Sequence, residues 1–247
     1  MPPPTIAVVL AAGKGTRMGS PLPKVLHPAA GRPLLAWVTA AARQVPCARI
    51  VVVYGHGAEA VRGGFAQESD LEWVLQEEQR GTGHALAQAE RVVSGAARLL
   101  VLSGDVPLLR PRTARLLVEE ASRGWGALAV ADLEDPGSLG RVVVRGDGAL
   151  EHMVEARDAT AAELRHRTVN AGLYALPAPE VFGYLRRVRP DNAQREIYLP
   201  DALNIAAAEG RSIRCVPLDD PTEAWGVNTP EDLERVGARL RARGTSP

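Results

Sequence analysis

The sequence IAVVLAAGKGTRMGSPLPKVLH, residues 6–27, joins an apolar run to a loop of small and basic residues. Every residue over 6–10 is apolar, which predicts a short strand buried on both faces. Ala11, Ala12 and Gly13 follow the strand, and side chains this small leave backbone N–H groups open to an anionic ligand. The stretch therefore predicts a phosphate-binding loop at the carboxyl end of a buried strand.

The loop departs from the two common nucleotide-binding fingerprints. Counted from Gly13, the dinucleotide pattern needs a glycine where the chain has Met18, and the loop of nucleoside triphosphatases needs Gly-Lys-Ser/Thr beginning at the same place. The basic residues that follow the small ones are Lys14, Arg17 and Lys24. We interpret the loop as a phosphate site of a different kind.

Lysine usage draws attention to the same loop. The chain has 29 basic residues, and Lys14 and Lys24 are its only lysines. A lysine ammonium is a compact charge on a flexible stem, whereas an arginine guanidinium is a planar fork. The two lysines are therefore interpreted either as phosphate contacts or as ordinary, solvent-facing cations of an arginine-rich chain.

Length, charge and cysteine content narrow the class of protein. A chain of 247 residues can bury a full core as one large α/β domain, with or without a small appendage. Its 29 acidic residues balance its 29 basic ones, so we expect no nucleic-acid partner. Cys47 and Cys215 lie far apart without metal-site spacing, which favours a reducing cytoplasm. The first apolar run is too short for a signal peptide or membrane span, so we expect a cytoplasmic protein without membrane contact.

Apolar runs alternate with amphipathic stretches through the first half of the chain. Strands are predicted over 6–10, 50–54, 71–75 and 99–102, and helices over 33–45, 58–67, 84–93 and 112–122. This order predicts the α/β class, with a doubly wound, mostly parallel sheet of the Rossmann-like type. Ligands of such sheets bind at the carboxyl ends of the strands.

The second half is less regular. Strands are predicted over 126–131, 140–144, 149–154 and 170–176, with a hairpin turn around Gly-Asp-Gly at 146–148. We expect this mixed region to form a smaller lobe. Thr229 begins a last helix, with a proline in its first turn, an acidic residue three places on, and Leu233, Val236 and Leu240 on one face. The chain is thus divided into a main domain, 1–228, and a helix with its tail, 229–247.

Asp105 follows the apolar run 99–102 in the sequence VLSGDVPLL. A carboxylate at the carboxyl end of a strand is suited to hold a divalent metal ion. The alternative is a plain Asp-Val-Pro turn, because aspartate is common in turns.

Gln76 ends another predicted strand, and Gly81, Thr82 and Gly83 open the helix after it. A carboxamide offers a donor and an acceptor, and glycine backbone admits a flat base, so the group suits the edge of a pyrimidine. The alternative is a glycine-rich helix start without a ligand.

Several motifs occur together and in order, namely LAAGKGTRM, LPKVLH, YGHG, GTGHA, GDVPL, Gly-Arg at 140–141, EARDAT, NAG, NAQREIYLPD and GVNTPEDL. With them the chain resembles, over nearly its whole length, the nucleotidyltransferase domain of the bacterial bifunctional N-acetylglucosamine-1-phosphate uridyltransferases. The resemblance implies a nucleotide-diphospho-sugar transferase fold with a sugar-side lobe. It also implies UTP and N-acetylglucosamine 1-phosphate as substrates, UDP-N-acetylglucosamine and pyrophosphate as products, and Mg²⁺ as cofactor.

The resemblance also implies roles for individual residues. Arg17, Lys24 and Asp105 would be catalytic, and Asp105 and Asn228 would hold the metal. The substrates would contact Leu10, Ala11, Ala12, Gly13, Lys24, Gln76, Gly81, Thr82, Ser103, Gly104, Asp105, Gly140, Glu155, Asn170 and Asn228, of which Gly140, Glu155 and Asn170 would hold the sugar.

Residue chemistry alone leaves some of these assignments open. Glu155 is also interpretable as a solvated charge, and Asn170 and Asn228 as turn or strand-edge amides. His56 and His84 are interpreted as structural, because a histidine in a tight turn or first helical turn usually serves local hydrogen bonding.

The chain departs from the family pattern on the sugar side. Leu139 replaces a common tyrosine, and Arg195, Ile197 and Pro200 replace glycine, tyrosine and threonine, so transfer to glucose 1-phosphate stays an alternative. Another alternative is a non-catalytic subunit that binds nucleotide sugars. Hexapeptide repeats of the family's β-helical acetyltransferase domain do not follow Arg243, so we expect a single-function enzyme or a fragment, and a monomer.

Overall fold

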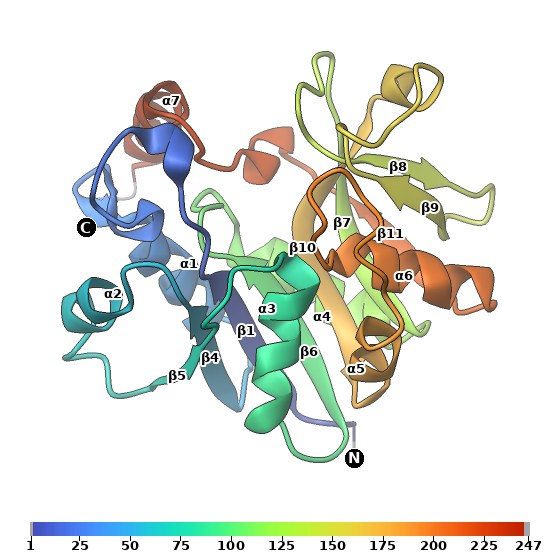
Figure 1. The fold of residues 1–247 in the computed structure, drawn as a ribbon, viewed down its shortest axis with the longest axis horizontal. Helices are drawn as coiled ribbons and strands as arrows, with labels where there is room; N and C mark the ends of the chain where they lie inside the picture. Colours follow the sequence, from blue (N-terminus) through green and yellow to red (C-terminus); the bar gives the residue numbers. More distant parts are fainter. Residues whose placement is uncertain (1, 245–247) are drawn as a thin grey trace.

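The computed structural model describes residues 2–244 and contains, within them, a nine-stranded sheet (Figure 1). Seven strands lie side by side in the order β11-β7-β10-β6-β1-β4-β5. Their bounds are Thr5–Ala11 for β1, Arg49–Tyr54 for β4, Leu71–Leu75 for β5, Ala97–Ser103 for β6, Gly126–Asp132 for β7, Thr168–Ala178 for β10 and Ile213–Pro217 for β11. On this path β10 alone is antiparallel to its neighbours β6 and β7, and the remaining pairs are parallel.

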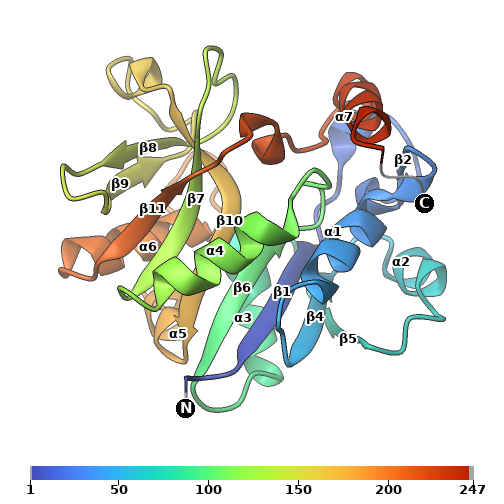
Figure 2. The ribbon, with the colours of Figure 1, turned by 180° about the vertical axis from the view of Figure 1, so that it is seen from behind.

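Helices cover both faces of the sheet (Figures 1 and 2). One face carries α1 (Leu34–Arg43), α2 (Ala58–Gly64) and α4 (Pro111–Ala121), and the other carries α3 (Thr82–Gln88), α5 (Glu180–Leu185) and α6 (Leu199–Ala208). Strand β1 explains the two layers, because Ala7 and Val9 belong to the core under the first face, whereas Ile6 and Val8 belong to the core under the second. The continuous apolar run at 6–10 is thus needed on both sides, as predicted.

Each element predicted in the first half is present, and the doubly wound α/β class is confirmed. Three helices are shorter than predicted, and the first of them, α1, covers Leu34–Arg43 instead of 33–45. Helix α2 ends at a Gly63-Gly64 pair, since glycine is a poor helix former. The helix expected over 84–93 begins two residues earlier and tightens after Gln88 into the 3-10 turn η3 (Ala89–Arg91).

The second half contributes more to the central sheet than expected. Strands β7 and β10, expected in a separate mixed region, lie inside the seven-strand path. The smaller part consists of β8 (Arg141–Val144) and β9 (Leu150–Val154), joined by the predicted hairpin turn, where Gly148 has a φ of 79°. Helices α5 and α6 and strand β11 were not predicted. Helix α6 is apolar nearly all round, and the apolar run of β11 is interrupted by Arg214.

The remaining elements are short, apart from the last helix. They are the two-stranded ladder β2 (Pro28–Ala29) and β3 (Arg32–Pro33) and the 3-10 turns η1 (Thr16–Met18), η2 (Lys24–Leu26), η4 (Glu163–Arg165) and η5 (Pro221–Ala224). Helix α7 (Pro230–Ala242) begins with the predicted capping box, in which the Thr229 and Asp232 side chains each accept from the other's backbone N–H. Positions 245–247 of the predicted tail lie outside the described residues.

A third, smaller apolar core holds α7 against the opening loop. Val236 and Leu240 of α7 are buried together with Trp37 of α1, Leu108 and Met18. Figures 1 and 2 show α7 beside the loop that follows β1. Met18 thus holds the loop to this core, while the neighbouring Arg17 is exposed.

Asp220 ties α7 to the rest of the domain. Its carboxylate accepts hydrogen bonds from the guanidinium groups of Arg110 at 2.6 Å, Arg239 at 3.1 Å and Arg243 at 3.0 Å, and from the hydroxyl of Thr222 at 2.6 Å. Burial raises the pKa of Asp220, but the hydrogen bonds from Thr222, Arg239 and Arg243 outweigh it and hold this pKa well below its usual range.

Asp220→Asn is expected to lower the free energy of unfolding at pH 7 by about 2 kcal/mol, because three guanidinium groups lose their shared anion. Because the pKa is lower in the folded state, this stabilisation is fully present above about pH 4 and is lost as the pH falls through the folded pKa. Urea unfolding at pH 7 and pH 3 checks this, since the difference between the variant and the wild type should narrow at pH 3. The control is Asp219→Asn, an exposed neighbour paired with Arg112, with an expected change of less than about 0.5 kcal/mol. Equal losses in the two variants would contradict the prediction.

Two further observations concern the predictions from composition. Cys47 and Cys215 are both free thiols, and burial raises the pKa of Cys47 to about 11 and that of Cys215 to about 12. Between residues 2 and 244, no helix combines the length and the apolar character needed to cross a membrane.

Candidate active site

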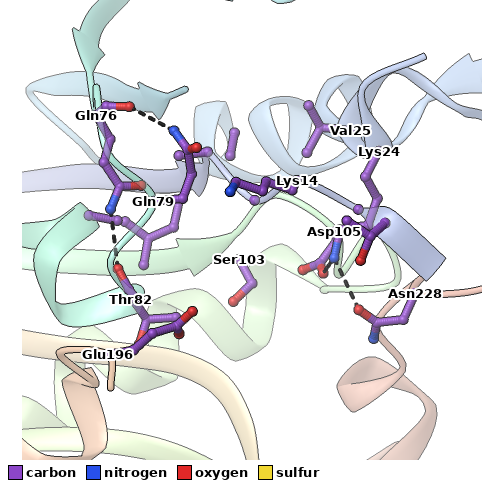
Figure 3. A pocket seen from close by; sticks show the side chains of 18 of the residues that line it. Lys14, Lys24, Val25, Gln76, Gln79, Thr82, Ser103, Asp105, Glu196 and Asn228 are labelled. Atoms are coloured by element: carbon purple, nitrogen blue, oxygen red, sulfur yellow. Dashed lines mark hydrogen bonds and ion pairs between the residues drawn. The ribbon is translucent and has the colours of Figure 1, made fainter. Parts of the chain in front are cut away.

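A pocket of about 540 Å³ opens at the carboxyl ends of β1, β5 and β6 (Figure 3). This is where a parallel sheet of this topology places its ligands. Most of the predicted site residues line it: Leu10, Ala11, Ala12, Gly13, Arg17, Lys24, Gln76, Gly81, Thr82, Ser103, Asp105 and Asn228. Four do not, namely Gly104, Gly140, Glu155 and Asn170.

The small residues after β1 form one wall of the pocket. Ala11 and Ala12 are buried, and a Cβ built on Gly13 would have no atom within 4 Å, so the space in front of this backbone is open. Gly15 has a φ of 62°, and a Cβ there would lie 2.6 Å from the Cβ of Lys24. Gly15 is therefore needed so that Lys24 can pack against the loop.

The loop segment that carries Lys24 is held from the other side by the YGHG motif. Gly57 has a φ of 67°, and a Cβ there would overlap the ring of Pro23. A Cβ on Gly55 would lie 2.7 Å from Nε2 of Gln79 and 3.0 Å from Cβ of Ala12. The two glycines thus allow the β4–α2 turn to contact both the opening loop and the residue before Lys24.

Lys24, Asp105 and Asn228 meet at the other end of the pocket (Figure 3). The Lys24 ammonium forms an ion pair with Oδ2 of Asp105 and donates to Oδ1 of Asn228 at 3.1 Å. Lys24 begins η2, Asp105 lies in the turn after β6, and Asn228 directly precedes the capping Thr229 of α7. The backbone fixes Asn228, because its N–H donates to Asp232 at 3.0 Å and its neighbour Val227 donates to the carbonyl of Asp105 at 2.9 Å.

The donor set of this cluster suits a hard divalent cation. A carboxylate oxygen and an amide oxygen converge on one cation, the Lys24 ammonium. Oxygen ligands of this kind fit Mg²⁺, which keeps several waters and takes its other ligands from phosphates. Among the described residues, no group of three or more His, Cys, Asp or Glu side chains is arranged to hold a metal ion.

Gln76 lines the pocket, and the two ends of its carboxamide have different surroundings. The side chain is 2% exposed, and its Nε2 donates to the carbonyl of Gly81 at 3.3 Å and contacts Nδ1 of His84 at 2.9 Å. The amide nitrogen is therefore engaged inside the protein, whereas Oε1 has no hydrogen bond to the described residues. The sequence predicted that both the nitrogen and the oxygen of the Gln76 carboxamide face the ligand. In the structure only the oxygen is available to accept a hydrogen bond from a ligand.

The two glycines of the GTGHA motif are required by close packing against another segment of the chain. A Cβ on Gly81 would lie 2.6 Å from the carbonyl oxygen of Ile197, and one on Gly83 would lie 2.9 Å from the same atom. The N–H of Gly83 donates to that carbonyl at 2.8 Å, and Thr82 Oγ1 accepts from Leu199 N–H at 3.1 Å. The motif thus joins the start of α3 to the segment before α6.

Gly104 does not line the pocket, and its lack of a side chain has a steric reason. A Cβ there would lie 3.1 Å from the carbonyl oxygen of Leu10, and its N–H donates to that oxygen at 2.8 Å. Gly104 therefore keeps β1 and β6 close together. Its neighbour Ser103 does line the pocket and donates to the carbonyl of Gly172 at 3.1 Å.

The three predicted sugar residues lie together but beside the pocket. The carbonyl of Gly140 accepts from the N–H of Asn170 at 2.9 Å, and a Cβ on Gly140 would lie 3.4 Å from Oε1 of Glu155. The Asn170 side chain donates to the Tyr174 hydroxyl at 2.7 Å and accepts from Gly172 N–H at 2.9 Å. Burial, and then the nearby carboxylate of Asp201, raise the pKa of Glu155, which does not fit the alternative of a freely solvated charge.

Five polar residues of the pocket received no role in the sequence analysis: Thr16, Gln79, Arg157, Gln194 and Glu196. Arg157 lies within EARDAT, and Gln194 and Glu196 lie within NAQREIYLPD, so the signal was present in the motifs but not assigned to residues. Burial raises the pKa of Glu196, while Arg157 and Lys14 lower it. Glu196 therefore lies close enough to two cations that line the pocket to feel their charge.

This fold and site define a class of protein: an α/β domain with a ligand pocket at the carboxyl ends of its parallel strands. The chain belongs to the family of MobA-like NTP transferase domains, whose family model matches residues 7–195. It is a nucleotidyltransferase domain.

The chain is similar to the bifunctional protein GlmU of several bacteria, as the ordered motifs indicated. It is 47% identical to that of Alkalilimnicola ehrlichii over 95% of this chain and 51% of the relative. The identity is 44% to that of Geobacter metallireducens, over 96% of this chain and 50% of the relative. The chain therefore spans about half the length of these curated relatives.

Solved structures with the same fold include sugar-nucleotide enzymes. A UDP-glucose pyrophosphorylase in complex with UDP-glucose superimposes with a TM-score of 0.78 at 17% identity, covering 97% of this chain and 99% of that one. A glucose-1-phosphate thymidylyltransferase described as putative, from Bacillus anthracis, gives 0.75 at 20% identity, covering 96% and 95%. At these identities the likeness establishes the fold.

Proposed function

We propose that the domain transfers a uridylyl group from UTP to N-acetylglucosamine 1-phosphate and releases pyrophosphate. The observation that carries this proposal is the meeting of Lys24, Asp105 and Asn228 beside the open backbone of residues 11–13. A cation and a pair of oxygen ligands at the end of a nucleotide-sized pocket suit the handling of a triphosphate.

The sugar phosphate supplies the nucleophile. One of its anionic oxygens attacks the α-phosphorus of UTP, a new P–O bond forms, and the bond from that phosphorus to the bridging oxygen of pyrophosphate breaks. Arg17 and Lys24 lie where their charges would offset repulsion between the anionic reactants, and the backbone of Ala12 and Gly13 would hold the nucleotide in line. Mg²⁺ held by Asp105 and Asn228 would neutralise further phosphate charge. No proton needs to be removed, so no general base is required.

One group of residues would select the base, and another would select the sugar. Oε1 of Gln76 would accept the N3–H of uracil, while backbone groups near Gly81 and Thr82 would bind its carbonyl oxygens. Gly140, Glu155 and Asn170 would contact the sugar beyond the phosphates. The clustering of these three residues beside the pocket supports a shared role.

A substrate panel is expected to single out UTP with N-acetylglucosamine 1-phosphate. Pyrophosphate release would be measured with UTP, CTP, GTP and ATP, each with N-acetylglucosamine 1-phosphate or glucose 1-phosphate, with and without Mg²⁺. We expect kcat/KM for the proposed pair to exceed every other pair by at least about tenfold, with release abolished by EDTA. Equal turnover of glucose 1-phosphate would overturn the sugar assignment, and binding of UTP without pyrophosphate release would favour a non-catalytic subunit.

A further inference from the structure

His84 lies behind Gln76, outside the lining of the pocket. The carbonyl of Gly81 can only accept, so the carboxamide atom of Gln76 that lies 3.3 Å from it must be the nitrogen. The same nitrogen lies 2.9 Å from Nδ1 of His84, and this second contact is a hydrogen bond only if Nδ1 carries no proton. The two contacts together point Oε1 of Gln76 into the pocket.

The surroundings of His84 favour that protonation state. The imidazole is partly buried, and burial, followed by the charges of Arg80 and Arg91, lowers its pKa despite the opposing effect of Glu78. A neutral imidazole with an unprotonated Nδ1 carries its proton on Nε2. The side-chain nitrogen of Gln88 lies 3.2 Å from Nε2, but it donates to the backbone carbonyl of His84 at 3.2 Å, so its contact with the ring is not a hydrogen bond in this tautomer. The contact of Nδ1 with the Gln76 nitrogen is therefore the observation that assigns the tautomer.

We propose that His84 is a positioning residue that makes the site select uracil over cytosine, by fixing Gln76 with its oxygen toward the base. This proposal rests on the proposed uridylyl transfer. Uracil presents an N3–H donor where cytosine presents an N3 acceptor, so a carboxamide oxygen at this place binds the first and repels the second. If the Gln76 carboxamide could flip, its nitrogen would face the pocket and the preference for uracil over cytosine would weaken.

The test compares His84→Ala with His84→Asn by measuring kcat/KM for UTP and for CTP. Alanine removes the nearer of the two acceptors of Gln76 Nε2 and leaves only the Gly81 carbonyl at 3.3 Å, whereas asparagine can place an amide oxygen near the position of Nδ1. We expect the UTP/CTP ratio to fall about tenfold or more in His84→Ala and to stay within about threefold of wild type in His84→Asn. A purely structural role would lower both rates together and leave the ratio unchanged in His84→Ala, which would overturn the proposal.

A wild-type measurement keeps the proposal testable if a variant folds poorly. N3-methyl-UTP lacks the N3–H donor and should be used at least about tenfold less efficiently than UTP. Equal use of the two nucleotides would also overturn the proposal. Failure of the proposed function is distinguishable, because the wild-type enzyme would then show no preference for UTP before any variant is made.

Discussion

Asp105→Asn is expected to lower kcat for pyrophosphate release by about 100- to 1000-fold, with little change in the melting temperature. Asp105 is the only carboxylate of the oxygen pair that meets at Lys24 among the described residues, and a neutral amide binds Mg²⁺ poorly. A bound metal ion is worth several kcal/mol to a transition state of this kind, and a 100- to 1000-fold loss corresponds to about 3–4 kcal/mol. Steady-state kinetics over a Mg²⁺ titration, beside a thermal melt, checks this.

The control is Asp132→Asn, at the carboxyl end of strand β7. Asp132 is exposed and paired with Arg167, and it does not line the pocket. Its turnover should stay within about twofold of wild type. If Asp105→Asn kept near-normal turnover at saturating Mg²⁺, Asp105 would be a turn residue and the metal assignment would be abandoned.

Lys24→Arg should lower turnover about tenfold or more, although the charge is kept. The Lys24 side chain is 12% exposed and is enclosed by Gly15, Asp105 and Asn228, so it is not the solvent-facing cation that its position in a loop suggested. A planar guanidinium needs more room and another approach angle than a compact ammonium. Lys24→Met, which removes the charge, should cost about 100-fold.

The same kinetic assay with both variants checks the prediction. Arg112→Lys, on α4 and 80% exposed, is a charge-conserving control that should leave turnover unchanged. Wild-type rates in Lys24→Arg would mean that position 24 supplies general positive charge, and that the placement of both lysines in one loop is coincidence.

The first half of the fold was predictable because its signals are local. The apolar run of β1 and the alternation of strands and helices follow from side-chain periodicity over a few residues. The antiparallel insertion of β10 between β6 and β7 was not predictable, since it depends on pairing between residues about 70 apart, such as Tyr174 and Val101. Helix α6 was missed because its apolar residues leave no amphipathic pattern.

The site was predictable where strand ends determine it. Asp105 and Gln76 each follow a buried strand, and the rule for parallel sheets brings such residues to one edge. The engagement of the Gln76 nitrogen by His84 and the packing role of Gly104 depend on contacts between elements, which no spacing in the chain reveals. Glu196 and Arg157 reach the pocket from a loop, where side-chain direction is set by tertiary packing.

The hydrogen bond between Lys24 and Asn228 joins residues 204 positions apart, which has a consequence for synthesis of the chain on the ribosome. Translation adds about 5–20 residues per second from the amino end, so the nucleotide-facing strands emerge many seconds before Asn228 does. Until the Thr229 cap forms and fixes Asn228, the nascent chain has Lys24 and Asp105 but lacks the amide that also contacts the Lys24 ammonium. The cluster of Lys24, Asp105 and Asn228 therefore forms only after Asn228 has been synthesised, and a chain that stops before this residue cannot form it.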